Sequence, residues 1–218
     1  MTNLAEVLRD AQDGRFPPAD GGVTLVPQPS PRDLGVLSFT AHAVVFADVD
    51  PAWIRERLPP GDLDAPLGPP FLQELAALTG RAAGNLDLLA VACPLPGSAP
   101  LALEELRDSG HPRVARARRY RDDVRVWVAP AQDDGPGGGV AGLLTVGRGV
   151  GGRWEVAIEV EPAHRGRGLG RLLAAAARHL APAPVWAQVA PGNAASVRAF
   201  IAAGYAPVGA EVLLSPEP

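Results

Sequence analysis

The sequence contains no lysine, so the 20 residues counted as Lys plus Arg are all arginines. A chain without lysine cannot form a Schiff base, cannot use the lysine of a Walker-type phosphate loop and offers no side-chain amine for its own modification. Its single cysteine, Cys93, excludes an intramolecular disulfide, and no catalytic cysteine signature surrounds it. These absences exclude several enzyme classes and are typical of a protein from a reducing compartment.

Long apolar runs are missing as well. No stretch of 18 apolar residues occurs, and the first residues lack the basic patch and apolar core of a signal peptide. The net charge of −4 provides no general attraction to nucleic acid or to an anionic membrane. The four histidines have no metal-ligand spacing. We therefore expect a cytoplasmic protein that uses no metal and binds neither nucleic acid nor membrane.

What the chain does contain is typical of folded domains, since 47% of its 218 residues are hydrophobic and 20% are charged. In the first half, runs rich in β-branched residues predict strands. Asp50 followed by Pro51 marks a helix start, and Gly80 marks a helix end. Here we expect helices over 4–12, 50–58, 69–79 and 101–106, and strands over 23–26, 34–49 and 86–93.

The second half begins with a charged run. Residues 113–121 hold five arginines, and Asp122 and Asp123 follow directly. We interpret this run as a solvated, locally neutralised face, with a contact to phosphate or substrate as the alternative. Beyond it we expect strands over 124–129, 140–146, 154–160 and 184–189, a turn over 133–139, and helices over 169–180 and 193–204.

The most informative segment joins the strand ending at Val160 to the helix beginning near Leu169. The first turn of a helix has unpaired N–H groups and a partial positive charge, so it stabilises an anion. Glycines without Cβ atoms let an anion approach the backbone, and arginines add fixed charge. The segment therefore predicts a diphosphate ligand. The glycines are Gly166, Gly168 and Gly170, and the arginines are Arg165, Arg167 and Arg171.

The sequence of this segment excludes two other phosphate-binding loops. A dinucleotide fingerprint G-x-G-x-x-G that begins at Gly166 needs glycine at position 171, where the chain has Arg171. The Walker pattern needs a lysine, and the chain has none.

Two motifs carry a family resemblance. The first is Arg165-Gly-Arg-Gly-Leu-Gly170, preceded by Val160-Glu-Pro162, and the second runs from Asn193 through Ser196 and Phe200 to Gly204-Tyr205. In the second motif Asn193 suits a helix N-cap, and Gly204 suits a left-handed C-cap. With these motifs the chain resembles the GCN5-related N-acetyltransferase (GNAT) superfamily over about residues 123–212.

The resemblance implies a fold of the α/β class, of α+β type. It is the acyl-CoA N-acyltransferase fold, a mixed twisted sheet flanked by helices, here with an N-terminal extension. It further implies an N-terminal α/β region over 1–115, on the acceptor side, and an acetyl-CoA-binding core over 116–218. Acetyl-CoA is then the cosubstrate, held between the strands over 154–160 and 184–189. The implied coenzyme contacts are Val160, Arg165, Gly166, Arg167, Gly168, Leu169, Gly170, Arg171, Asn193 and Ser196.

Catalytic residues are less clearly marked. Acetyl transfer needs a neutral amine, and an alkylamine has a pKa of about 10, so a base is expected. In branches of the family that act on protein N-termini, a Glu base and a Tyr acid occupy positions where this chain has Gln188 and Phe200. Neither of these side chains transfers a proton usefully. The replacement candidates are Glu155 and Glu159, which share one face of their strand, and Tyr205. The alternative for each glutamate is a charge at an exposed strand edge or in an ion pair with arginine, and the alternative for Tyr205 is a core aromatic after the helix C-cap.

The leading interpretation is an N-acetyltransferase that acts by direct attack of a primary amine, from a small molecule or a peptide, in a ternary complex. One alternative is a catalytically silent module that binds acyl-CoA and uses the N-terminal region for sensing or partner binding. Another is an O-acyltransferase, or a transferase of longer acyl groups, on the same scaffold. The sequence leaves the oligomeric state open, with a homodimer among the states to consider.

Overall fold

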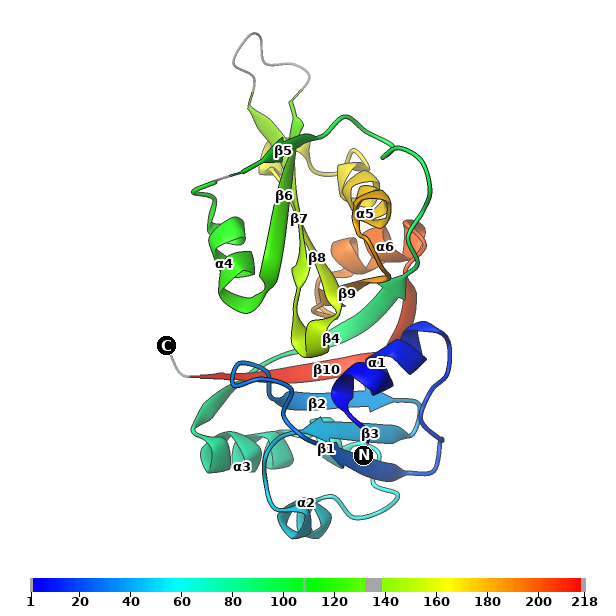
Figure 1. Cartoon of the computed structure of the whole chain (residues 1–218), viewed down its shortest axis with the longest axis vertical. Helices are drawn as coiled ribbons and strands as arrows, with labels where there is room; N and C mark the ends of the chain where they lie inside the picture. The colour runs from blue at the N-terminus through cyan, green and yellow to red at the C-terminus, as the bar shows by residue number, and fades with distance from the viewer. Residues whose placement is uncertain (1, 108, 132–138, 217–218) are drawn as a thin grey trace. The chain divides into compact units, whose positions relative to one another are not determined.

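The structure is a computed structural model that describes residues 2–107, 109–131 and 139–216. The chain divides into two compact units (Figure 1). The first unit consists of Met1–Leu89 and Val208–Pro218, and the second consists of Ala90–Pro207. Two strands, β4 (Arg81–Ala92) and β10 (Ala206–Pro216), contribute residues to both units. The domain boundary expected after residue 115 stays a prediction.

In the first unit the strand order is β1-β3-β2-β10-β4. Strand β1 runs parallel to β3, whereas β2 runs antiparallel to both β3 and β10. Apolar side chains of these strands form one core with those of α2 and α3. The remaining elements of this unit are α1 (Leu4–Gln12), β1 (Gly22–Val26), β2 (Gly35–Phe39), β3 (His42–Phe46), α2 (Pro51–Arg57) and α3 (Pro69–Thr79).

Local signals account for the helix boundaries in this unit. Asn3 and Glu6 form a capping box at the start of α1. As expected, Oδ1 of Asp50 caps α2 by accepting the N–H of Ala52 at 2.8 Å. Helix α3 ends at Gly80, whose φ of 63° is left-handed, also as expected.

The second unit is a sheet with helices on both faces, and its strand order is β9-β8-β7-β6-β5. Figure 1 shows α4 on one side of these strands and α5 and α6 on the other. The pairs β5–β6, β6–β7 and β7–β8 are antiparallel, whereas β9 runs parallel to β8. Its elements are β5 (Glu104–Leu106), α4 (Pro112–Tyr120), β6 (Asp122–Pro130), β7 (Val140–Arg148), β8 (Trp154–Val160), α5 (Leu169–Leu180), β9 (Val185–Val189) and α6 (Ala194–Ala202).

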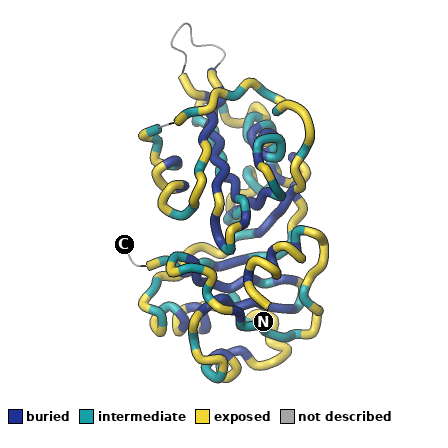
Figure 2. The backbone as a smooth tube through the Cα atoms, viewed as in Figure 1, coloured by how far each residue is buried: buried dark blue, intermediate teal, exposed yellow. Residues whose placement is uncertain are grey.

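Buried residues gather along the strands of each unit (Figure 2). In the second unit the larger core lies between the sheet and the helices α5 and α6, and a smaller cluster lies under α4. This mixed sheet with flanking helices confirms the predicted fold class. None of the described helices has the length and apolar character that crossing a bilayer requires.

Two expectations about elements were wrong. Residues 101–106, predicted as a helix, instead end in strand β5, which pairs with β6 and carries an ion pair from Glu105 to Arg125. The run over 34–49 is not one strand but the hairpin β2–β3, in which Ala41 turns the chain with a φ of 51°. The strand β5 was missed because its partner lies 20 residues further along the chain. The hairpin was missed because no glycine marks the turn between β2 and β3. The turn expected over 133–139 lies outside the described residues, except for residue 139.

Close packing of β2 against β10 gives a test of this arrangement. A Cβ added to Gly35 would lie 2.4 Å from the carbonyl oxygen of Val212 and 2.8 Å from Cζ of Phe46. We therefore expect Gly35→Ala to lower the free energy of unfolding by about 1–3 kcal/mol in urea titrations. The control is Gly110→Ala, where an added Cβ meets nothing within 4 Å, and a change within about 0.5 kcal/mol is expected. Equal stabilities of the two variants would contradict the β2–β10 register.

Candidate functional site

Strand β8 forms one side of the candidate site. Its edge toward β7 is paired along the whole strand. Its edge toward β9 is paired only at its first two residues, opposite Val185 and Trp186, although both strands continue beyond that point. The edge of β8 over residues 156–160 therefore has no ladder partner in β9, and its free backbone groups suit an extended ligand with peptide-like amides.

The loop between β8 and α5 turns at two left-handed glycines. Gly166 and Gly168 have φ values of 75° and 82°, in the left-handed region that favours glycine. Gly168 is the N-cap of α5, and no side chain caps this helix. A Cβ added at either glycine would meet nothing within 4 Å. The unpaired N–H groups of the first turn of α5 are therefore open to an anion.

The three arginines of this loop differ in their surroundings. Nε of Arg165 donates to the carbonyl oxygen of Val160 at 3.0 Å, so this side chain lies along the end of β8. Arg167 and Arg171 are exposed, and neither forms an ion pair with another described residue. Their positive charge next to the start of α5 therefore adds to the attraction for an anion.

The second motif forms α6, which packs beside α5. Oδ1 of Asn193 accepts the N–H of Ser196 at 3.1 Å, which confirms the predicted cap. Gly204 is left-handed, as expected, with a φ of 87°. A Cβ there would lie 2.4 Å from Nη1 of Arg178, which donates to the carbonyl oxygen of Ala203 at 2.8 Å. The contact of Asn193 and Ser196 with a coenzyme stays a prediction.

Gly170 is where the two motifs meet. A Cβ added to this residue would lie 3.7 Å from Cγ2 of Val160 and 3.9 Å from Cβ of Ala199. The end of β8, the first turn of α5 and the middle of α6 are therefore neighbours. This explains why the loop motif and the Asn motif occur together in one sequence.

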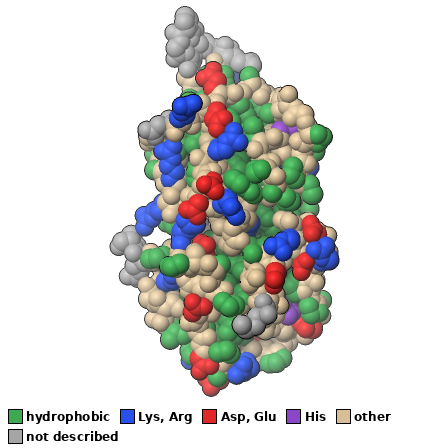
Figure 3. Space-filling model, viewed as in Figure 1, with side chains coloured by type: hydrophobic (Ala, Val, Ile, Leu, Met, Phe, Trp, Pro, Cys, Tyr) green, Lys and Arg blue, Asp and Glu red, His purple; other side chains and the backbone are tan. Residues whose placement is uncertain are grey.

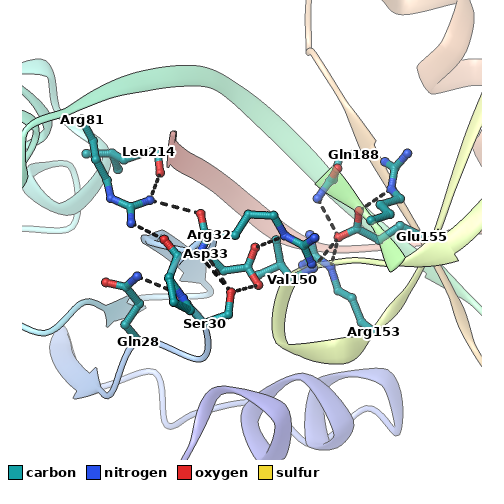
Figure 4. A network of polar contacts seen from close by, with 12 residues as sticks. Gln28, Ser30, Arg32, Asp33, Arg81, Val150, Arg153, Glu155, Gln188 and Leu214 are labelled. Atoms are coloured by element: carbon teal, nitrogen blue, oxygen red, sulfur yellow. Dashed lines mark hydrogen bonds and ion pairs between the residues drawn. The ribbon is translucent and has the colours of Figure 1, made fainter. Parts of the chain in front are cut away.

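Glu155 lies at the start of β8, with only 3% of its surface exposed. Its Oε1 accepts from Nε of Arg153 at 2.9 Å and from Nε2 of Gln188 at 3.0 Å (Figure 4). The N–H of Val150 donates to the same oxygen at 3.2 Å. Oε2 accepts from Nε of Arg121 at 2.7 Å. These contacts occupy both carboxylate oxygens.

 Burial acts to raise the pKa of Glu155, but the charges of Arg153 and Arg121 outweigh burial and hold the pKa below its ordinary value. A carboxylate that stays ionised and fully bonded is a poor proton acceptor. The geometry therefore favours a structural anchor over the catalytic base that the sequence suggested at this position.

Glu159 lies on the same face of β8, four residues further on. Its side chain is 32% exposed and accepts a hydrogen bond from Nε of Arg113. This bond lowers the pKa of Glu159. Of the two predicted glutamates, Glu159 is thus the one whose carboxylate remains accessible from solvent.

His111 lies close to the carboxylate of Glu159 but is poorly suited to act as a base. Its Nδ1 accepts the N–H of Arg113 at 3.1 Å and caps α4. Its Nε2 lies 3.8 Å from Oε1 of Glu161. Because Nδ1 is an acceptor, the neutral ring carries its proton on Nε2, which leaves no lone pair there.

The run over 113–121 supplies Arg113, which bonds Glu159, and Arg121, which bonds Glu155 together with Arg153. The interpretation of that run as a solvated face was therefore only partly right. Figure 3 shows basic side chains along the edge of the second unit where Figure 1 labels α4. Arg113 and Arg121, at the two ends of the helix, instead form the ion pairs. The sequence contained a signal for these ion pairs, which is the spacing of the two arginines and of the two glutamates. Eight residues of helix span about 12 Å, and four residues of strand span about 13 Å, so the two spacings match.

Tyr205, the third predicted catalytic residue, is buried. Its hydroxyl donates to the carbonyl oxygen of Ala174 in α5 at 3.1 Å. Its ring lies edge-on to Phe200, with 4.9 Å between ring centroids. Burial raises the pKa of Tyr205 above its ordinary value. These contacts favour a core role over that of an acid.

The arrangement as a whole can bind an anion at the start of α5 and an extended chain along β8. In the described part of the chain, no three His, Cys, Asp or Glu residues are grouped to hold a metal ion. A family model described as the Acetyltransferase (GNAT) family matches residues 97–205, which is half of the chain. The chain belongs to the GNAT acetyltransferase family.

Solved structures of GNAT proteins resemble the chain at low identity. A GCN5-related N-acetyltransferase from Kribbella flavida is 18% identical, with a TM-score of 0.41 over 68% of this chain and 65% of that one. A GCN5-related N-acetyltransferase from Sphaerobacter thermophilus is 14% identical, with a TM-score of 0.39 over 67% of this chain and 56% of that one. The match thus spans less than two thirds of either structure. The comparison with curated proteins gave no match.

The ion-pair cluster of this GNAT chain predicts a pH effect on stability. Because the pKa of Glu155 is lowered in the folded state, its contribution is present above the ordinary glutamate pKa of about 4.3 and is lost as pH falls through the lowered folded value. Glu155→Gln leaves Arg153 and Arg121 without their counter-charge, so we expect it to lower the free energy of unfolding by about 3–5 kcal/mol at pH 7. Urea titrations should show a smaller difference from the native chain near pH 3.

Glu105→Gln is the matched control, since Glu105 pairs with Arg125 at the surface. This exposed pair should contribute about 0–1 kcal/mol. If Glu155→Gln were no more destabilising than Glu105→Gln, Glu155 would not be an anchor.

Proposed function

We propose that this GNAT chain is an acetyl-CoA-dependent N-acetyltransferase. In this proposal it transfers an acetyl group to a primary amine of a small molecule or peptide, by direct attack in a ternary complex. The observation that carries the proposal is the left-handed loop at Gly166 and Gly168, which leaves the start of α5 uncapped and beside open space. Such a helix start suits a diphosphate.

Residues of both motifs have places in this proposal. The backbone N–H groups from Gly166 to Arg171 hold the diphosphate, and the side chains of Arg167 and Arg171 add charge. The edge of β8 that lacks a partner in β9 hydrogen-bonds the amides of the pantetheine arm, next to the Val160 carbonyl that accepts from Arg165. Asn193 and Ser196 border the same ligand from α6. When bound, acetyl-CoA supplies the acetyl group as a reactive thioester.

The amine must lose a proton for the transfer to be completed. Its nitrogen forms a bond to the acetyl carbon while the carbon–sulfur bond breaks and the electron pair leaves with sulfur. Among the predicted proton acceptors, Glu159 has the accessible carboxylate, so we assign it to receive the amine proton, directly or through water. Its lowered pKa makes it a weak base, and most of the rate must come from positioning.

A catalytically silent acyl-CoA-binding module is the second candidate. It is favoured by the bonded carboxylate of Glu155 and by the hydroxyl of Tyr205, which is held by a backbone carbonyl. Gln188 and Phe200 occupy the positions where the branches of the family that act on protein N-termini carry a base and an acid. In this alternative the N-terminal region, over 1–115, carries the sensing or partner-binding role.

Coenzyme binding can be tested with a pair of glycine variants. Gly168 and Gly80 are both left-handed, with open space around an added Cβ. Gly168→Ala and Gly80→Ala should therefore lose similar stability, about 1–2 kcal/mol. Calorimetry should show that acetyl-CoA binds at least about tenfold more weakly to Gly168→Ala, because the N–H groups there no longer keep their geometry. Unchanged affinity in Gly168→Ala, or no binding to the native chain, would contradict the loop assignment.

A thiol-release assay with a panel of primary amines separates the two candidates. If the chain is an enzyme, native protein releases coenzyme A with at least one amine, and Glu159→Gln lowers kcat by about 10²–10⁴-fold. Glu161→Gln, two residues along the chain, serves as the control and should retain most of the rate. Both variants should bind acetyl-CoA like the native chain. Binding of acetyl-CoA without thiol release from any amine would support the silent module instead.

A further inference from the structure

The first unit contains a cavity of about 550 Å³ that the proposed function does not use. It lies between the end of β3, the helices α2 and α3, and the start of β4. Small-molecule sites usually measure about 300–1,000 Å³, so this volume is large enough for a metabolite-sized ligand. All of its lining residues belong to the first unit.

One part of the cavity wall is apolar. Trp53, Val49 and Leu78 line it. Leu78 is 52% exposed, which is unusual for a large apolar side chain and leaves it free to cover a ligand. The ring of Trp53 packs against Phe71, with 5.8 Å between centroids, and Cζ of Arg57 lies 4.1 Å from the centre of the same ring. This wall can therefore bury the apolar body of a small molecule against a fixed aromatic ring.

The other part of the wall carries two carboxylates, Asp48 and Asp50. Oδ1 of Asp48 accepts the N–H of Gln28 at 3.0 Å, and Oδ1 of Asp50 accepts the N–H of Ala52 at 2.8 Å. Each carboxylate thus has one oxygen bonded to the backbone. Within the described ranges neither of them forms an ion pair, so their negative charge is not neutralised by the protein.

Arg81 also lines the cavity, but its guanidinium donates to backbone carbonyls. Nη1 bonds the carbonyl oxygens of Arg32 and Leu214 at 3.1 Å, and Nη2 bonds that of Pro31 at 2.6 Å (Figure 4). These bonds hold its charge at the base of β4. The lining as a whole keeps an excess of one negative charge, since two carboxylates face one guanidinium.

We propose that this cavity binds an organic ammonium ion with an apolar or aromatic body. The ammonium group donates to the free oxygens of Asp48 and Asp50, and the body packs on Trp53 and Leu78. Both the charge and the shape of the cavity favour this class of ligand. The two carboxylates would repel an anionic ligand, and a bare metal ion would leave the apolar wall without a partner. None of the lining residues belongs to the proposed coenzyme loop.

The test uses 2-phenylethylamine as the probe and the full chain without coenzyme, by calorimetry and tryptophan fluorescence. We expect saturable binding of one equivalent at low-millimolar amine. The neutral analogue 2-phenylethanol should bind at least about tenfold more weakly, because it lacks the charge-assisted bonds. The double variant Asp48→Asn/Asp50→Asn should bind the amine at least about tenfold more weakly, and the alcohol as the native chain does. Asparagine caps helices as well as aspartate does, so this variant should fold.

Two further variants complete the design. Asp10→Asn/Asp13→Asn removes two charges that pair with Arg15 in the same unit, and it should leave amine affinity unchanged. Leu78→Gln alters an exposed residue and should weaken the amine and the alcohol by the same factor, about threefold. The proposal is overturned if the native chain shows no saturable amine binding, if amine and alcohol bind equally, or if both double variants lose affinity equally. Failure of acetyl-CoA binding would count against the proposed function alone.

Discussion

Backbone groups that lose a strand partner need another partner or water, and β8 loses β9 as a partner after two residues. Its far end is followed by the short 3-10 helix Pro162–His164 and by the glycine loop, after which α5 begins without a side-chain cap. The two sets of unpaired groups lie next to each other, because Gly170 brings the end of β8 into contact with the start of α5 and with α6. The second unit thus concentrates its unsatisfied hydrogen-bonding capacity at one place, where a long ligand with amides and phosphates can satisfy it.

The two glutamates of β8 show how position changes the chemistry of one residue type. Both lie on the face opposite α5 and α6, and both face an arginine from the α4 region. Glu155 is enclosed by donors from four residues in three segments, whereas Glu159 lies near the strand end and keeps contact with solvent. The first carboxylate fixes the sheet to α4 at the point where β8 and β9 separate. The second remains accessible from solvent.

Sequence reasoning succeeded where the physical signal is local. The caps at Asp50, Gly80 and Asn193 were predicted because each involves residues within about three positions of one another. Strand β5 was missed because its pairing with β6 is a distant contact that outweighs local propensity. The bond from Tyr205 to Ala174, 31 residues away, was invisible for the same reason. Alternation along β8 gave the correct face for both glutamates, but three of their partners, Arg113, Arg121 and Gln188, come from 33 to 46 residues away.

The absence of lysine has a structural counterpart. Arginine presents several N–H donors in a planar fork, so one side chain can bond more than one acceptor at fixed angles. Arg178 uses this to join the carbonyl oxygens of Cys93 and Ala203, and Arg81 joins three carbonyls at the base of β4. An ammonium group at these positions has no planar fork and is more strongly hydrated. In this chain Arg81 and Arg178 therefore connect strand and helix ends through backbone carbonyls, while Arg113 and Arg121 act as counter-charges to the glutamates of β8.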